Sequence, residues 1–201
     1  MQGFGKVGRG AARFLAEAGV RVLAVSDQYG GVAHEDGLDV AALEAHVDET
    51  GSVVGFAGGH PVDGEDILTA DVDLLVPAAV EGVLHAGNAG LVRARVVVEG
   101  ANGPTTQEAD AVLAERGVTV VPDILANAGG VVVSYFEWVQ ANQAYWWSQE
   151  EVEERLAQRM TSAWTDVMNE AAERGVTLRT AATCLAVRRV AEAHRLRGLY
   201  P

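Results

Sequence analysis

The 201-residue sequence predicts an α/β fold, in which a doubly wound, mostly parallel sheet is followed by a C-terminal helical appendage. Short β-branched runs alternate with helical patterns in the first half, whereas only helical patterns follow about residue 127. The runs are continuously apolar, as in strands that are covered on both faces. Such alternation of strands and helices is typical of an open parallel sheet.

Four strands are predicted, at residues 20–25, 72–76, 96–98 and 118–121. Apolar positions at helical spacing predict helices over residues 7–18, 40–47 and 106–116. Ser148 followed by Glu151 is a capping-box pattern, and it begins a long helix that ends before Gly175. A last helix is expected over residues 179–197. We therefore predict a dinucleotide-binding domain over residues 1–138 and C-terminal helices that pack on it over residues 139–201.

Composition excludes several classes of partner. The formal net charge is −13, and Lys6 is the single lysine, so we expect no nucleic-acid and no anionic membrane partner. Cys184 is the only cysteine, which excludes an intrachain disulfide and suggests a reducing compartment. The histidines are scattered without ligand spacing, so no metal is expected. The sequence contains neither an apolar span nor a leader pattern, and we expect a cytoplasmic protein.

A glycine-rich turn carries the G-x-G-x-x-G spacing of dinucleotide-binding turns, formed by Gly3, Phe4, Gly5, Lys6, Val7 and Gly8. Its glycines allow a tight turn, close approach to a pyrophosphate, and close packing of a helix on a strand. The free N–H groups of the following helix form an anion site. Asp27 ends a predicted strand, where a carboxylate can accept hydrogen bonds from an adenosine ribose. The alternative is a structural glycine turn with a solvated aspartate.

Three further segments carry a resemblance to a known family: residues 98–106 (VEGANGPTT), 121–131 (VPDILANAGGV) and 133–138 (VSYFEW). Together they closely resemble the glutamate dehydrogenase family, in an agreement that runs from Gln2 to the region of Leu199. The resemblance implies a Rossmann-like domain and the oxidative deamination of L-glutamate to 2-oxoglutarate and ammonia. In that reaction hydride passes from the α-carbon to the nicotinamide, and water hydrolyses the resulting imine. The resemblance also implies a homo-oligomer, which is a hexamer in the family.

The resemblance assigns cofactor-binding residues beyond the glycine turn. Asn102 and Asn127 match positions beside the nicotinamide, whereas Ser26 and Asp27 match the adenosine-ribose end, and Ala78 lies in a further matching segment. Asparagine in a glycine-rich turn is also ordinary turn chemistry. The cofactor is NAD or NADP. Asp27 favours NAD, because its carboxylate repels a 2′-phosphate, although some NADP-using members of the family also have aspartate here.

The resemblance assigns two substrate-binding residues. Ser134 matches the position that reaches the γ-carboxylate of glutamate, and Val131 matches one that lines the substrate pocket. Alternatively, Ser134 caps a helix. A leucine- or phenylalanine-type dehydrogenase, which acts on a branched or aromatic amino acid, is a further alternative. Ser134 favours glutamate, because an apolar substrate needs no hydroxyl at its distal end.

The sequence departs from the family in its catalytic residues. In the family, a separate N-terminal domain carries the catalytic lysine and aspartate, and nothing in this chain matches either. We therefore assign no catalytic residue and expect the chain to bind cofactor at best. Lys6 stands where the family commonly has asparagine, so it is a cation in the phosphate turn and not a displaced base. A second hypothesis is a non-catalytic nucleotide-binding subunit or paralogue that joins complete chains.

The first strand of the sheet is largely missing, since only Met1 and Gln2 precede Gly3. Neighbouring strands would then have unpaired backbone groups, and we expect the chain to be unstable alone. Relatives commonly have valine where Met1 stands. We hypothesise that a valine codon was read as a start or that the sequence is a fragment. An in-frame glycine-rich lysine motif upstream in the genomic DNA would support this hypothesis, and stop codons there would contradict it.

Overall fold

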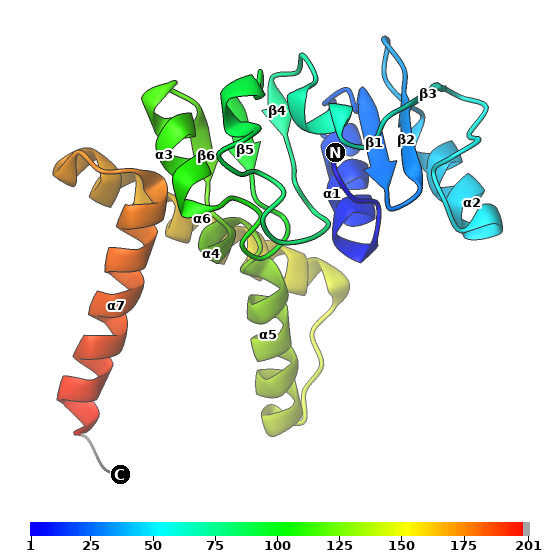
Figure 1. The fold of residues 1–201 in the computed structure, drawn as a ribbon. Helices are drawn as coiled ribbons and strands as arrows, with labels where there is room; N and C mark the ends of the chain where they lie inside the picture. Colours follow the sequence, from blue (N-terminus) through cyan, green and yellow to red (C-terminus); the bar gives the residue numbers. More distant parts are fainter. Residues whose placement is uncertain (199–201) are drawn as a thin grey trace. The chain divides into compact units, whose positions relative to one another are not determined.

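A computed structural model of the chain describes residues 1–198 and is drawn in Figure 1. The chain divides into two compact units, Met1–Asp123 and Ile124–Pro201, and each is described by itself. Residues 199–201, at the end of the predicted C-terminal helices, lie outside the described residues. The predicted domain boundary after residue 138 falls inside helix α5 (Gly129–Gln143) and stays a prediction.

Two three-stranded sheets lie in the described part of the first unit. One sheet is antiparallel and consists of β1 (Ala24–Asp27), β2 (Gly30–Ala33) and β3 (His60–Val62). The other sheet is parallel and consists of β4 (Leu74–Leu75), β5 (Val96–Val98) and β6 (Thr119–Val121). The predicted α/β class is confirmed, with the parallel pairing at the last three predicted strands (Figure 1).

Met1 and Gln2 join the two sheets. Gln2 forms parallel bridges to Ser26 in β1 and to Pro77 after β4. The Ser26 N–H donates to the Met1 carbonyl at 3.0 Å, and the Gln2 N–H donates to the Val76 carbonyl at 2.9 Å. These two residues therefore lie between β1 and β4, where the first strand of the sheet was expected. The glycine turn that follows them lies at the carboxyl ends of the strands.

The antiparallel part of the sheet was not predicted. Strand β2 begins with two glycines, and β3 contains Pro61, which cannot donate to a ladder and suits an edge strand. Neither segment has the β-branched run that predicts a strand. The strand predicted at residues 20–25 begins only at Ala24, whose carbonyl accepts a 2.8 Å hydrogen bond from the Met1 ammonium. The first residue of β1 therefore lies beside Met1.

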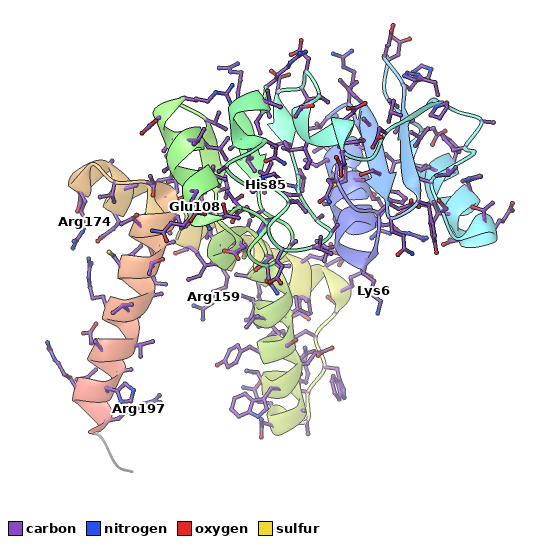
Figure 2. The ribbon with its side chains drawn as sticks, viewed as in Figure 1. Lys6, His85, Glu108, Arg159, Arg174 and Arg197 are labelled. Carbon is purple, nitrogen blue, oxygen red and sulfur yellow. The ribbon has the colours of Figure 1, made fainter. Side chains whose placement is uncertain are left out.

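Helix α1 (Lys6–Glu17) follows the glycine turn, as predicted. Lys6, labelled in Figure 2, is exposed at its first residue. Helical spacing predicted an apolar face of Val7, Ala11, Phe14, Leu15 and Ala18, but three of these are exposed within this unit: Val7 by 53%, Phe14 by 60%, and Ala18. Gly8 and Ala12 are the buried residues of α1. Small side chains allow the helix to pack closely, so larger apolar residues of α1 are not needed for that contact.

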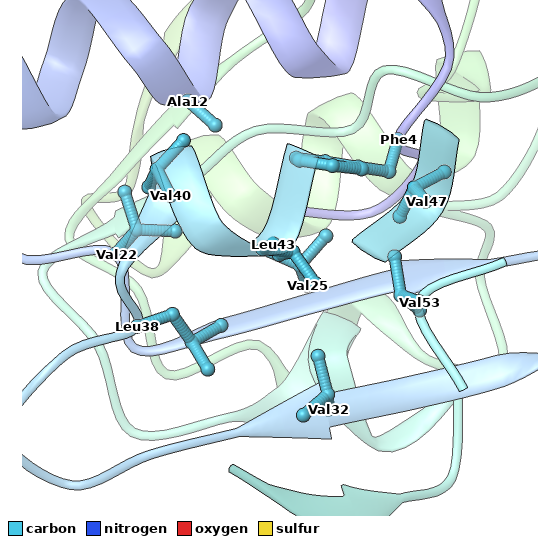
Figure 3. Close-up of a cluster of buried hydrophobic side chains, with 10 residues drawn as sticks. All are labelled: Phe4, Ala12, Val22, Val25, Val32, Leu38, Val40, Leu43, Val47 and Val53. Carbon is cyan, nitrogen blue, oxygen red and sulfur yellow. The ribbon is translucent and has the colours of Figure 1, made fainter. Parts of the chain in front are cut away.

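The core of the first unit comprises two clusters of buried apolar side chains. The first, shown in Figure 3, lies between β1, β2, α1 and α2 (Val40–Thr50) and contains Phe4, Ala12, Val22, Val25, Val32, Leu38, Val40, Leu43, Val47 and Val53. The second gathers around β4, β5 and α3 (Gln107–Glu115) and contains Leu68, Leu75, Leu84, Ala89, Val92, Ala94, Val97, Ala109 and Leu113. Three short helices complete the unit or lead out of it: η1 (Asp66–Thr69), η2 (Ala89–Leu91) and α4 (Asp123–Ala126).

The second unit contains α5, α6 (Gln149–Arg174) and α7 (Leu178–Arg197). The predicted capping box is confirmed, because the Ser148 hydroxyl accepts from the Glu151 N–H and the Glu151 side chain accepts from the Ser148 N–H. Gly175 ends α6 in the left-handed conformation, with φ at 64°. Local chemistry therefore sets both ends of this helix. Within residues 1–198, no helix is long and apolar enough to cross a membrane.

Candidate functional site

The three glycines of the turn occupy three different environments. Gly3 has φ at +96°, and a Cβ there would lie 2.8 Å from the backbone nitrogen of Ala79. A Cβ on Gly8 would lie 2.0 Å from the carbonyl oxygen of Gly3. At Gly5, by contrast, a Cβ would meet nothing within 4 Å. Gly3 and Gly8 are thus required by the turn itself, whereas Gly5 leaves open space at the start of α1.

The start of α1 presents backbone donors at this open space. Gly5 is the N-cap residue in an extended conformation, and the N–H of Arg9 donates to the Gly5 carbonyl at 2.9 Å. The N–H groups of Lys6, Val7 and Gly8 precede that bond, so they have no carbonyl partner within the helix. The first turn of α1 carries no acidic residue. These donors and the positive end of the helix dipole form an anion site.

A cleft of about 630 Å³ lies at the carboxyl edge of the sheet. It brings together most of the predicted cofactor-binding residues of the first unit: Gly3, Phe4, Gly5, Lys6, Ser26, Asp27 and Ala78. Val7 and Gly8 are not among its lining residues. A neighbouring cavity of about 700 Å³ shares Gln2 and residues 26–29 with the cleft. Both volumes fall in the range of small-molecule and cofactor sites.

Two of the lining residues contribute little of their side chains. Phe4 is 5% exposed, because its ring packs in the first core cluster. Ser26 is 2% exposed and pairs through its backbone with Met1 and Gly3. At Phe4 and Ser26 the cleft therefore presents mainly backbone atoms, as expected of positions that a dinucleotide approaches closely.

The carboxylate of Asp27 holds the loop that follows α2. Its Oδ2 accepts from the Ser52 hydroxyl at 2.7 Å and from the Val53 N–H at 2.8 Å. Its Oδ1 accepts from the N–H of Tyr29 at 2.8 Å. Asp27 is half-buried, and it lines the cleft and the neighbouring cavity. The predicted ribose-binding aspartate thus also has a structural role, which sequence reasoning missed.

Arg9 brings a second cation to the cleft. Its guanidinium forms an ion pair with Asp48, donates through Nε to the Phe4 carbonyl at 3.3 Å, and lies 5.7 Å from the centre of the Phe4 ring. Asp48 balances this charge, whereas Lys6 forms no ion pair within residues 1–198. Sequence reasoning missed Arg9, although a basic residue one turn into the helix was a usable signal.

Asn102 lies in an exposed turn after β5. Hydrogen bonds to the carboxylates of Asp123 and Glu99 hold this turn in place. The Gly103 N–H donates to Oδ2 of Asp123 at 2.8 Å, and the Asp123 N–H donates to Oε2 of Glu99 at 2.8 Å. Glu99 is fully buried at the end of β5. Gly103 has φ at +55°, so turn chemistry accounts for this glycine. Sequence reasoning missed Glu99 and Asp123, although a carboxylate directly after an apolar strand was a visible signal.

The remaining predicted site residues belong to the second unit. Asn127 is half-buried between α4 and α5, whereas Val131 and Ser134 are exposed on α5. The alternative in which Ser134 caps a helix is wrong, because Ala128 is the N-cap residue of α5. Three positions apart on one helix, Val131 and Ser134 share a face. Most of the predicted cofactor-binding residues of the first unit therefore line one cleft, whereas Val7, Gly8 and Asn102 do not. Asn127, Val131 and Ser134 belong to the second unit.

Comparison with known proteins gives consistent matches along the chain. The family model described as Glutamate/Leucine/Phenylalanine/Valine dehydrogenase matches residues 1–198. A glutamate dehydrogenase of Thermotoga maritima is 52% identical over 202 residues, which cover 100% of this chain and 49% of the relative. In Halobacterium salinarum, an NAD-specific glutamate dehydrogenase A is 48% identical and an NADP-specific glutamate dehydrogenase A1 is 52% identical. These two matches also cover 100% of this chain, and 46% and 49% of the relatives.

A solved structure is similar over the same extent. The crystal structure of hetero-hexameric glutamate dehydrogenase from Thermus thermophilus, in a Leu-bound form, matches with a TM-score of 0.93 and 40% sequence identity. The match covers 100% of this chain and 47% of that one. The chain therefore spans about half the length of the relatives it matches.

Proposed function

Because the chain belongs to the family of glutamate, leucine, phenylalanine and valine dehydrogenases, we propose that it carries the cofactor-binding half of a glutamate dehydrogenase. One observation carries the proposal. The open space at Gly5 lies at the donor-rich start of α1, inside the cleft that also holds Asp27. A pyrophosphate needs such a place, where no side chain keeps it from the backbone N–H groups.

The residues of the first unit fit the successive parts of a nicotinamide dinucleotide. The N–H groups at the start of α1 bind the pyrophosphate, with Lys6 adding positive charge. Asp27 accepts a hydroxyl of the adenosine ribose. Asn102, on its anchored turn, offers a side-chain amide to the nicotinamide end. When bound, the nicotinamide accepts the hydride that leaves the substrate α-carbon.

The proposed cofactor is NAD. The Asp27 carboxylate is held at the edge of the cleft by three donors, so it cannot easily move away from a 2′-phosphate. The Asp27 carboxylate and a 2′-phosphate bound beside it would repel each other, whereas a ribose hydroxyl donates to the carboxylate. Calorimetric titrations should give tighter binding of NADH than of NADPH. The Asp27→Ser variant should lose most of this preference, and a wild-type preference for NADPH would overturn the assignment.

The proposed substrate is L-glutamate. Ser134 and Val131 lie exposed on one face of α5, and a hydroxyl beside an apolar surface suits the second carboxylate of glutamate and its methylene groups. In a full-length protein that also carries the N-terminal domain of the family, Ser134→Ala should weaken 2-oxoglutarate binding to the NADH-loaded enzyme without changing NADH affinity. Ser162→Ala, at an exposed position of α6, is the matched control. Equal 2-oxoglutarate affinity in the wild type and Ser134→Ala would contradict this role.

The proposed assembly is a homo-hexamer in the cytoplasm. The similar Thermus thermophilus protein is a hetero-hexamer by its description, and the single cysteine suits a reducing compartment.

The whole proposal is tested by calorimetric titration of NADH into the chain. Saturable binding with one site per chain is expected. A folded chain that binds no NADH would overturn the proposal.

A further inference from the structure

Tyr29 occupies the tip of the β1–β2 hairpin, beside the proposed ribose site. The register pairs Asp27 with Gly30, so Gln28 and Tyr29 form a two-residue turn at the carboxyl end of β1. The Tyr29 side chain is 68% exposed, and it lines both the cleft and the neighbouring cavity. Within residues 1–198, the aromatic pairs of the structure do not include Tyr29. Its ring therefore has a free face at the site.

The hydrogen bonds of Asp27 determine which of its oxygens can take a ligand. Each carboxylate oxygen has two lone pairs for hydrogen bonds. Oδ2 already accepts from the Ser52 hydroxyl and the Val53 N–H, whereas Oδ1 accepts only from the Tyr29 N–H. A ribose hydroxyl thus has one place left, on Oδ1. That oxygen is the one held against the backbone of Tyr29.

From this geometry we propose that Tyr29 stacks on the adenine of the bound dinucleotide. A ribose bonded to Oδ1 lies next to the Tyr29 backbone, and the base attached to that ribose then lies within reach of the phenol ring. Base stacking on an aromatic side chain is worth about 1–3 kcal/mol by alanine substitution. This inference rests on the proposed binding of a nicotinamide dinucleotide. Ser52 is a positioning residue, because its hydroxyl and the Val53 N–H occupy both acceptor places on Oδ2 and leave only Oδ1 for the ribose.

The test compares two ligands and three variants. NADH and ADP-ribose both contain adenine, but ADP-ribose lacks the nicotinamide, so an effect at the adenosine half weakens both equally. Tyr29→Ala should raise the Kd of both ligands about tenfold, and Tyr29→Phe should stay within about twofold of the wild type. Phe14→Ala removes an exposed ring of the same unit that lies outside the cleft, and it should change neither Kd.

The outcomes separate this inference from the proposed function. If the wild type binds NADH and folded Tyr29→Ala binds it equally well, the stacking role is overturned while the cofactor assignment stands. A loss of NADH affinity without loss of ADP-ribose affinity also overturns the role, because the effect then lies outside the adenosine half. If the folded wild type binds neither ligand, the proposed function fails together with the inference.

Discussion

The hydroxyl of Ser52 donates to Oδ2 of Asp27 at 2.7 Å and so joins the loop after α2 to the end of β1. Gly51 ends α2 in the left-handed conformation, with φ at 81°, which turns the chain so that Ser52 and Val53 can reach Asp27. Val53 is also fully buried in the first core cluster. The same contact thus stabilises the fold and fixes the carboxylate at the cleft.

The Ser52→Ala variant should lower the free energy of unfolding by about 1 kcal/mol, because a half-buried carboxylate loses one of its donors. Urea unfolding followed by circular dichroism measures this change. Ser162→Ala, at an exposed position, should change stability by less than about 0.5 kcal/mol. If both variants unfold at the same urea concentration, the Ser52 hydroxyl contributes nothing to stability.

In a chain prepared with a free amino group at Met1, the buried amino group should make stability depend on pH. Although the residue is only half-buried, desolvation of its ammonium lowers the pKa of the amino group from 8.0 to about 5. The unfolded chain therefore binds the proton more tightly than the folded chain between pH 5 and 8. The free energy of unfolding should rise through this window, by up to about 4 kcal/mol, and be constant in this contribution above pH 8.

Acetylation of Met1 isolates this contribution from other titrating groups. The acetylated nitrogen keeps one N–H for the Ala24 carbonyl but carries no charge. A cavity of about 150 Å³, lined by Met1 and by residues 20–24 and 72–76, leaves room for the added group. The acetylated chain should lack the rise that the free chain shows between pH 5 and 8. Parallel stability curves for the two chains would contradict the burial of this charge.

Gly8 and Gly10 should respond oppositely to alanine, although both lie in α1. A Cβ at Gly8 would meet the Gly3 carbonyl oxygen at 2.0 Å, so Gly8→Ala must move the turn and should cost more than about 2 kcal/mol. A Cβ at Gly10 meets nothing within 4 Å, and Gly10→Ala should stabilise the helix by up to about 1 kcal/mol. Thermal unfolding compares the two variants, and equal melting temperatures would show that the turn tolerates a side chain at Gly8.

The sequence predicted those parts of the fold that local chemistry decides. Ser148, Glu151 and Gly175 fix the ends of α6 within a few residues of the chain, so the helix could be recognised without its surroundings. The glycine turn was recognisable for the same reason, since a short segment sets its geometry. Strand β3, with His60 and Pro61, depends on a partner strand distant in sequence, and nothing in its own residues predicts pairing.

The parts of the site that sequence reasoning missed depend on contacts between distant segments. Asp27 meets Ser52 across 25 positions of the chain, and Asp123 meets Glu99 across 24. Spacing within one motif cannot predict such pairs. The exposure of Phe14 has a related cause, because helical spacing predicts which residues share a face but not which neighbour covers it.

The most direct test of the central claim is NADH binding by the Gly5→Ala variant, with Gly10→Ala as the matched control. Both variants add one methyl group where the structure has nothing within 4 Å, but only Gly5 lines the cleft. If a pyrophosphate binds at the start of α1, Gly5→Ala should raise the Kd for NADH at least about tenfold, and Gly10→Ala should leave it unchanged. Equal NADH affinity in the wild type and both folded variants would contradict the claim.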